Sequence, residues 1–429
     1  ESVTYTDGKT LNLHLGYGGT LGSKGSYYVA GQFRNQDPTN RAGMDPRSQY
    51  PALADGSPDP RETTFNRINH KYGSAELQDV SLFLNADYEL DEFKSWYAFG
   101  GLSRRNGSAS GFYRRALDGR NTPEIYPDGF LPHIDTNIGD FSLSTGVKGQ
   151  WGEWNYDISE TIGRNRLEYG VSKSLNASLG VYSQSSFYAG ALEFTQASTN
   201  LDLVRSFDVG TANPLSLALG AEFRYENYGI EAGEAASYVS GPIPGKAAGS
   251  QVFPGFMPRN VTDESRTNIG AYVDVENDVT DKLLLGAAVR FENYSDFGSI
   301  VTGKFSGRFE VMEGLAVRAA ASTGYRAPSL AQSYFSTIST NFINGVPFEV
   351  GTFPVTSPVA RALGAVDLEA ETSVNLSGGA TFESAIFSLT ADFYNISITD
   401  RVVISENFTG SGSRGGGSLR VRERERERD

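Results

Sequence analysis

The sequence predicts an all-β protein, a transmembrane antiparallel β-barrel, of which this chain supplies about 14 strands. Two patterns carry the prediction: apolar and polar residues alternate over long segments, and short turns alternate with long polar connections. Only 39% of the residues are hydrophobic, and no stretch approaches the roughly 18 consecutive apolar residues of a membrane-spanning helix. A barrel explains this modest hydrophobicity, because only alternate residues of its strands face lipid.

Alternation with a period of two residues identifies the individual strands, and residues 283 to 291 show it clearly. The odd-numbered positions up to Phe291 are apolar, whereas the opposite face carries Arg290. Residues 300 to 311 repeat the pattern with Lys304 on the polar face. Several such segments hold the alternation for about ten residues, longer than the usual strand of a soluble sheet. Since the polar faces carry charge in mid-strand, we expect them to meet water.

The same criterion places a strand in each of 14 segments, taken here in chain order. The first seven are expected at residues 10–22, 25–36, 76–89, 93–105, 139–151, 153–166 and 197–209. The other seven are expected at residues 214–228, 266–278, 281–295, 299–311, 314–325, 371–383 and 385–398. Gly, Asp, Asn or Ser residues lie in most of the turns that join them, as tight turns require.

The connections between these strands fall into two length classes that alternate along the chain. Long polar connections are expected at residues 36–75, 106–138, 167–196, 229–265 and 326–370, whereas the other connections are short turns, including the one at 296–298. A compact soluble domain has no reason to collect its long loops at one end. An outer-membrane barrel does, because its periplasmic turns are short and its extracellular loops are long.

Aromatic residues near the strand ends fit the girdles that such barrels carry at the two membrane interfaces. The candidates are Phe291, Tyr294, Tyr225, Tyr228 and Tyr394. Ordinary strand packing would explain any one of them alone. Only their collective position favours the barrel.

The strand at 314–325 ends in a run that needs explanation. By the alternation of loops this strand rises from a periplasmic turn, so that Tyr325 and Arg326 reach the outer interface. Pro328 has no N–H for a sheet ladder and disfavours helical backbone at Ala327. We therefore expect the chain to leave the sheet here and enter a long external loop.

The chemistry of a catalytic or metal site is missing from the sequence. His14, His70 and His133 are far apart and lack a metal-type spacing, and the absence of cysteine excludes thiolate metal sites and disulfides. No nucleophile elbow or phosphate-binding loop is present. A formal net charge of −14 argues against a nucleic-acid partner. We predict no catalytic residues, no metal site, no cofactor and no enzyme activity.

The segment TGYRAPSLAQSYF at 323–335, followed by DLEAETSVNLSGGATF at 367–382, resembles the barrel of TonB-dependent outer-membrane receptors. Further agreement lies near the start of the chain, in SLNASLG at 174–180, in TNLDLVRSFDVG at 199–210 and in LALGAEFRYENYGIEAGE at 217–234. The family motif at the strand exit comprises Gly324, Tyr325, Arg326, Ala327, Pro328 and Ser329.

The resemblance implies a place in the outer membrane of a Gram-negative bacterium, with lipids and lipopolysaccharide as neighbours. It implies binding of a scarce nutrient at the external loops, namely a ferric siderophore or other metal chelate, a cobalamin-like molecule or an oligosaccharide. Energy for uptake would come from the TonB complex. Family barrels have about 22 strands around a plug domain preceded by a TonB box, and this sequence contains neither plug nor box.

Residues 1–408 are therefore expected to form a partial barrel, with about two strands missing before Glu1 and about six after Phe408. Residues 409–429 change to Gly/Ser-rich sequence and then to strict Arg/Glu alternation. Such charges cost roughly 2 to 4 kcal/mol each on a lipid face at the bilayer midplane. We expect this tail to be disordered or an artefact of the reading frame or assembly.

One cluster of cations stands out as a candidate ligand site. Arg104, Arg105, Arg114, Arg115 and Arg120 lie at the outer end of one strand and in the loop that follows. Cationic residues at the mouth of a barrel could attract an anionic chelate by local steering, or could bind lipopolysaccharide phosphates.

Three readings of function remain open at this stage. The receptor reading is favoured, and we expect the 14 strands alone to leave open edges that do not survive in lipid. A passive porin is the alternative and would need a self-closing set of strands. A barrel-based adhesin or hydrolase would require surface binding without uptake or a Ser/His pair on one face, respectively.

Overall fold

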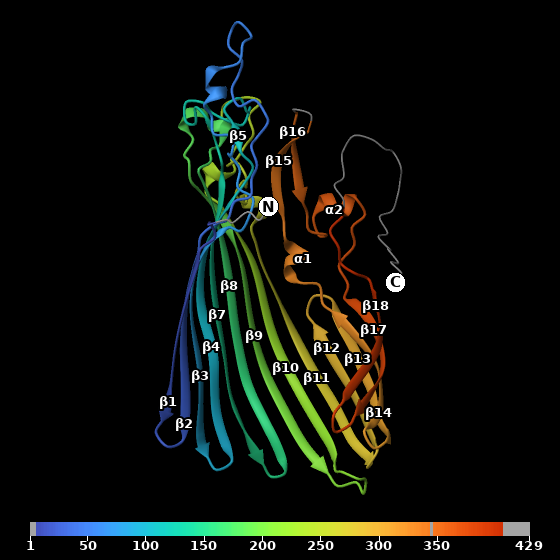
Figure 1. Cartoon of the computed structure of the whole chain (residues 1–429). Coiled ribbons are helices and arrows are strands. Elements are labelled where there is room, and N and C mark those ends of the chain that lie inside the picture. The colour runs from blue at the N-terminus through green and yellow to red at the C-terminus, as the bar shows by residue number, and fades with distance from the viewer. Residues whose placement is uncertain (1–5, 344–345, 406–429) are drawn as a thin grey trace.

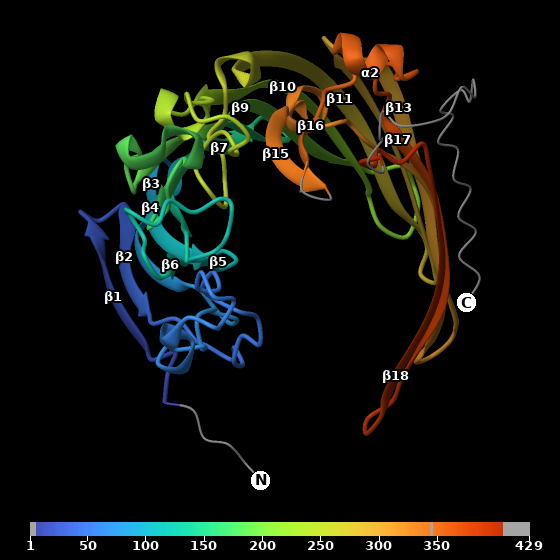
Figure 2. The same ribbon diagram turned by 90° about the horizontal axis from the view of Figure 1, so that it is seen from above.

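A computed structural model describes residues 6–343 and 346–405 and shows one large curved sheet with loops gathered at one end (Figure 1). The sheet has 14 strands in the order β1-β2-β3-β4-β7-β8-β9-β10-β11-β12-β13-β14-β17-β18, with every neighbouring pair antiparallel. Seen from above, the strands follow an open arc whose edges in the described part of the chain are β1 and β18 (Figure 2). The sheet is thus a curved wall with a concave and a convex face.

All 14 predicted strands are confirmed. The first seven of the sheet are β1 (Thr10–Leu21), β2 (Gly25–Gln36), β3 (Glu76–Asp91), β4 (Lys94–Ser110), β7 (His133–Trp151), β8 (Trp154–Ser172) and β9 (Phe187–Phe207). The others are β10 (Leu215–Ala232), β11 (Thr262–Thr280), β12 (Leu283–Tyr294), β13 (Gly298–Met312), β14 (Leu315–Arg326), β17 (Glu371–Glu383) and β18 (Ser388–Thr399). Among the residues described, no helix has the length and apolar character needed to cross a membrane.

Six strands, β4 and β7 to β11, extend at least four residues further than predicted at the end that carries the long loops, and the first four of them extend by five residues or more. The outer end of β4 continues to Ser110, β7 already begins at His133, β8 runs to Ser172 and β9 begins at Phe187. Polar residues and glycine are frequent in the extensions of β4 and β7, so the sequence of these two extensions resembles loop. They remain strand because each finds its ladder partner in the neighbouring extension, as in the pair His133 and Ser172.

The register gives each strand one apolar and one polar face. Leu219, Val273 and Val289 are direct neighbours across β10, β11 and β12, and residues with the same parity are apolar along much of these strands. The opposite parity carries the charged side chains, such as Arg290. Large apolar side chains of the first kind are exposed, with Val289 at 55%, because they face the surroundings of the wall rather than a protein core.

Two of the residues expected in the aromatic girdles lie instead on the charged face of their strands. Tyr228 and Tyr294 are each only 5% exposed and share the charged parity of their strands, whereas Tyr225 and Phe291 have the apolar parity and are exposed. The expectation was wrong for Tyr228 and Tyr294 because proximity to a strand end does not determine the face. A shift of one residue reverses it.

Short elements within the long connections gather at the outer end of the wall, and several of them lie on its concave side (Figures 1 and 2). The strands among them are β5 (Arg114–Arg115), β6 (Gly129–Phe130), β15 (Thr337–Ile343) and β16 (Val346–Thr352), and the helices are η1 (Pro60–Thr63), η2 (Ala177–Tyr182), η3 (Ala235–Ser237), η4 (Pro258–Asn260), α1 (Leu330–Tyr334) and α2 (Pro358–Ala362). Tyr228 and Ile230 of β10 pack against Phe256 of the next loop and Leu330 of α1. This apolar cluster fixes two loops to the wall and identifies the charged face as the inner one.

The strand exit predicted from Pro328 is confirmed. Strand β14 ends at Arg326, and the chain turns through Pro328 into α1. Ser329 caps this helix by accepting a hydrogen bond from the Gln332 backbone N–H at 3.1 Å, and the Gln332 side chain accepts in return from the Ser329 N–H at 2.9 Å. This reciprocal capping box explains why the motif ends in serine.

Candidate ligand-binding site

The five predicted arginines do not form one cluster. Arg104 and Arg105 are consecutive on β4 and therefore point to opposite faces of the wall. Arg105 pairs with Asp79 at 2.7 Å on the inner face. Arg104 lies opposite Val80 and shares the outward, apolar face with it. Arg104 is exposed and makes no hydrogen bond or ion pair with any other described residue.

The other three arginines lie together in the loop between β4 and β7, each in a different environment. Arg120 pairs with Asp118 at 2.8 Å, and Arg115 donates to the Ser48 carbonyl at 2.7 Å. Arg114 is 8% exposed and donates to the Phe112 carbonyl at 2.9 Å. Burial, and to a lesser extent the positive charge of Arg120, lowers the pKa of Arg114 to about 10.

Arg114 is thus a buried cation without a carboxylate partner among the described residues. Its second hydrogen bond goes from Nε to the Gln251 side-chain oxygen at 3.3 Å, which joins this loop to the loop between β10 and β11. A buried charge is usually paired, since its desolvation is costly. An anion delivered from outside would supply the missing partner.

A second polar centre organises the loop between β2 and β3, beside the arginine loop. Asp45 is 4% exposed and accepts two hydrogen bonds from the Arg47 side chain, at 2.8 and 2.6 Å. These bonds hold the pKa of Asp45 well below its usual range. Arg47 also lies over the ring of Phe112, with 4.6 Å between its guanidinium carbon and the ring centroid. The two loops are therefore locked together at their base.

The inner face of the wall carries a chain of ion pairs at β10, β11 and β12. Arg290 binds Glu222 at 2.7 Å and also pairs with Glu292. Arg266 pairs with Glu226, and both side chains are less than 10% exposed. Arg266 also donates to the Pro328 carbonyl at 2.6 Å, so the loop that follows β14 is held against these ion pairs.

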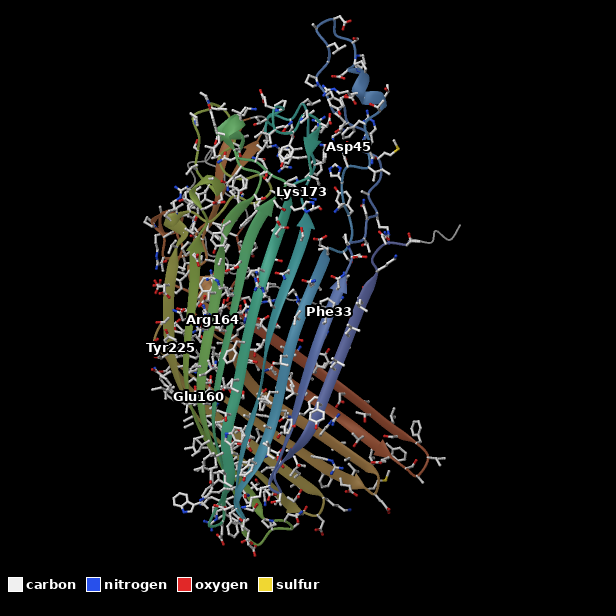
Figure 3. All side chains as sticks on the ribbon, turned by 90° about the vertical axis from the view of Figure 1, so that its left-hand side faces the viewer. Phe33, Asp45, Glu160, Arg164, Lys173 and Tyr225 are labelled. Carbon is white, nitrogen blue, oxygen red and sulfur yellow. The ribbon has the colours of Figure 1, made fainter. Side chains whose placement is uncertain are left out.

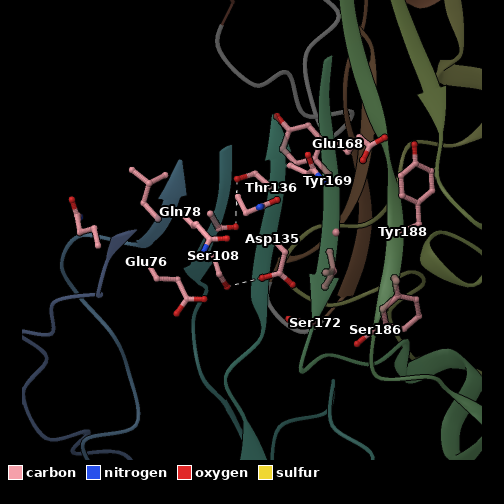
Figure 4. A pocket seen from close by; sticks show the side chains of 18 of the residues that line it. Glu76, Gln78, Ser108, Asp135, Thr136, Glu168, Tyr169, Ser172, Ser186 and Tyr188 are labelled. Carbon is pink, nitrogen blue, oxygen red and sulfur yellow. Dashed lines mark hydrogen bonds between the residues drawn. The ribbon is translucent and has the colours of Figure 1, made fainter. Parts of the chain in front are cut away.

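A cavity of about 870 Å³ crosses the outer ends of six neighbouring strands, from β2 to β9 (Figure 4). Ser108 and Asp135 meet in its wall, where the Ser108 hydroxyl donates to a carboxylate oxygen at 2.6 Å. Glu168, Tyr169 and Tyr188 line its far side. On β4, β7, β8 and β9 its lining residues belong to the strand extensions that the sequence patterns assign to loops, whereas those on β2 and β3 lie within predicted strands.

The histidines give no metal centre. His14 is in β1, His70 is buried in the loop between β2 and β3, and His133 begins β7. No group of three or more His, Cys, Asp or Glu side chains in the described residues could hold a metal ion. The sequence patterns did not predict the cavity, nor the contacts of Arg266 with Glu226, Asp296 and the Pro328 carbonyl. From the sequence, an Arg or Glu that forms an ion pair between segments looks the same as one whose charge is simply solvated.

Comparisons with known proteins agree with this architecture. The family described as TonB dependent receptor-like, beta-barrel, matches residues 5–422. A ferric enterobactin receptor, PirA of Pseudomonas aeruginosa, is 25% identical over 305 residues, which cover 69% of this chain and 36% of that protein.

Solved structures share the fold at low sequence identity. The siderophore receptor PirA from Pseudomonas aeruginosa matches with a TM-score of 0.56 and 14% identity over 92% of this chain and 53% of its own. The corresponding receptor from Acinetobacter baumannii gives 0.57 and 14% over 93% and 51%, and the RagAB peptide transporter gives 0.57 and 10% over 92% and 45%. The chain thus spans between about a third and about half of these relatives.

Proposed function

The chain belongs to the TonB-dependent receptor-like β-barrel family, and from this we propose that it works in the energised uptake of a scarce nutrient, a ferric siderophore, across the outer membrane. Outer-membrane barrels of this family are receptors and transporters rather than enzymes. The observation that supports an anionic ligand is Arg114 in the loop between β4 and β7, a buried cation without a carboxylate partner among the described residues, together with a relative named as a ferric enterobactin receptor. Ferric complexes of such chelators are anionic, and Arg114 offers a desolvated cation.

The geometry supports a division of tasks within the wall. The outward apolar face suits lipid, with lipopolysaccharide on the outer leaflet, and the inner charged face suits a water-filled channel. The loops that carry Arg114, Arg115 and Arg120 lie over the inner side at the outer end (Figure 2). A ligand held there would stand at the entrance of the passage, and the TonB complex would supply the energy for its release inward.

Binding of ferric enterobactin to the full-length protein tests the ligand assignment. Arg114→Gln removes the buried charge, whereas Arg114→Lys retains it in a side chain of similar length. Loss of one charge-assisted contact predicts about tenfold or more weaker binding for the first variant, with the second much closer to wild type. The pair Arg205→Ser and Arg318→Ser removes two cations far from these loops and should leave affinity unchanged.

Equal losses in Arg114→Gln and Arg114→Lys would show that packing, and not charge, matters at this position. Unchanged affinity in Arg114→Gln and in a combined Arg115→Ser/Arg120→Ser variant would remove the arginine loop from the proposal. Uptake by intact cells answers the separate question of energy. Accumulation that persists after the TonB complex is deleted would favour the passive-channel alternative.

A further inference from the structure

Two arginines lie directly opposite each other on the inner face of the wall, near the short turns. Arg308 of β13 and Arg318 of β14 are direct cross-strand partners. Both positions have the parity of Arg290, which belongs to the charged inner face. Like charges directly opposite each other destabilise a sheet. Each arginine therefore needs an anion close by.

Only one of the two arginines has a carboxylate partner. Arg318 donates two hydrogen bonds to Asp392 of β18, at 2.9 and 2.5 Å, and reaches it across Gly379 of β17, where a Cβ would collide with the carboxylate. Arg308 makes no side-chain hydrogen bond or ion pair with any other described residue. On its other side, the carboxylate of the same cross-strand row is Asp278, two strands away on β11. Arg308 is thus a cation without a partner within the described chain.

A recess of about 210 Å³ lies beside Arg308 on the inner face. Its floor is a cross-strand row of small residues on β12, β13, β14 and β17, namely Gly286, Ser306, Ala320 and Ser377. Lys304 and Arg308 lie two residues to either side of Ser306 on β13, roughly 13 Å apart along the strand. Lys304 also has no hydrogen-bond or ion-pair partner among the described residues. Two unpaired cations therefore border an open recess.

The size of this recess suits a brief contact rather than storage of a ligand. It is smaller than the roughly 300–1,000 Å³ of pockets that enclose a small molecule. A bulky anion would present only its charged face to Lys304 and Arg308. Weak binding of this kind favours movement through a channel, because a tightly held ion would not leave.

Near the short turns, the inner face of β8 to β11 carries acids instead. Asp157 of β8 and Asp202 of β9 are direct neighbours, and Asp274 of β11 lies on the same face. Tyrosine hydroxyls, and not cations, bind the first two, from Tyr97 at 2.8 Å and from Tyr272 at 2.6 Å. Figure 2 shows that β9 and β13 belong to different parts of the arc. An anion inside the arc would be repelled from β8–β11 and attracted to β13.

We propose that Lys304 and Arg308 form a second, weak anion site on the inner face, which an anionic chelate contacts on its way from the external loops to the periplasm. The proposal rests on the proposed function, from which it takes the ligand and the direction of movement. It adds the route, along β13 and β14 and away from the acids of β8 to β11. Arg318 is not part of this site, because Asp392 already neutralises it.

Thiol labelling of the full-length protein in detergent tests the charge of the site without any siderophore. The chain contains no cysteine, so Ser306→Cys introduces its single thiol. The matched control is Ser159→Cys, since Glu160 is labelled in Figure 3 on the outward face of β8 and its neighbour Ser159 points inward beside Asp157. The rate ratio of an anionic to a cationic methanethiosulfonate reagent should be about tenfold higher at position 306 than at 159. Lys304→Ser/Arg308→Ser should abolish this difference.

Uptake of ferric enterobactin by cells that produce the full-length protein tests the role in passage. Lys304→Ser/Arg308→Ser should leave the binding affinity at the cell surface within about twofold of wild type and lower the uptake rate at saturating ligand about tenfold. Lys304→Arg/Arg308→Lys retains both charges and should transport as wild type does. The control Lys148→Ser removes an inner-face cation opposite Asp157 and should change neither quantity.

Equal reagent ratios at positions 306 and 159 would overturn the anion site. A thiol at 306 that reacts with neither reagent would also overturn it, because another segment of the protein would then cover the recess. Unchanged saturating uptake in the double serine variant would exclude a role in passage, and lost uptake with a TonB-independent leak of small solutes would assign the cations to holding such a segment. A wild-type protein that does not bind ferric enterobactin but keeps the reagent selectivity counts against the proposed function alone.

Discussion

The two faces of the wall are stabilised in different ways. On the outward face, apolar side chains such as Val289 and Phe305 are exposed and the protein supplies few polar contacts between them. On the inner face, side chains at the same strands are joined by ion pairs and by loops that pack inward. The outward face therefore depends on its surroundings for stability, whereas the inner face depends on mutual compensation of buried charges.

We expect the largest loss of stability when a buried charge on the inner face loses its ion-pair partner. Arg266→Leu leaves Glu226 and Asp296 without their cation and frees the Pro328 carbonyl. Breaking a buried pair typically costs about 3–5 kcal/mol, because the remaining charge stays buried. Urea unfolding of the full-length protein in lipid should show this decrease. Arg266→Leu/Glu226→Met should recover much of it, and a double variant as unstable as the single one would contradict the argument.

The second effect contrasts neighbouring residues of one strand. Leu376 lies on the outward face of β17 and is 51% exposed, whereas Ser377 points inward. Arginine on the lipid face costs roughly 2–4 kcal/mol near the bilayer midplane, but costs little in water. Leu376→Arg should therefore impair folding into lipid vesicles much more than Ser377→Arg does. Equal costs for the two variants would mean that the faces have been assigned wrongly.

The motif loop provides a smaller test at the boundary between the faces. Ser329→Ala removes the side chain that caps α1, which should cost about 0.5–2 kcal/mol of local stability. Hydrogen exchange should increase in residues 330–334 and stay unchanged in β14. Ser329→Asp retains a capping oxygen and should restore protection. Faster exchange in both variants would mean that the hydroxyl has another role.

Sequence reasoning located the strands well because barrel strands obey one local rule, the alternation of faces. The rule failed at His133 and Ser172, where the strands continue in polar sequence because their pairing partner does the same. It could not foresee Ser108 meeting Asp135, which come from different strands and depend on register. The arginine prediction grouped Arg104 with Arg114 because they are close in sequence, although strand parity and burial place them in different environments.

Acidification should loosen a single external loop. His70 is 8% exposed, its Nδ1 lies 2.7 Å from the Asn69 side-chain oxygen, and its Nε2 has no partner in the described structure. Burial lowers the pKa of His70, opposed by Asp45 and assisted by Arg47. The unfolded loop then binds the proton more readily, so stability is full above about pH 6.5 and falls as the pH decreases.

Limited proteolysis of the loop between β2 and β3 checks this direction. Cleavage should be faster at pH 5.5 than at pH 7.5 in the wild-type protein, with about the same rate at both values in His70→Phe. The aromatic replacement keeps the contact with the Phe112 ring, whose centroid is 4.6 Å from that of His70. A pH response that persists in this variant would assign the effect to another group.

The smallest expected effect concerns an exposed ion pair of the outward face. Arg164 pairs with Glu193 at 2.7 Å across β8 and β9, and the Arg164 side chain is 54% exposed. Exposed pairs contribute only about 0.2–1 kcal/mol because water and salt compete with them. A double-mutant cycle with Arg164→Ala and Glu193→Ala should give a coupling in this range that decreases at high salt. A coupling as large as that of Arg266 and Glu226 would mean that this outward position is desolvated, and the boundary between lipid and water would then lie further out along β8.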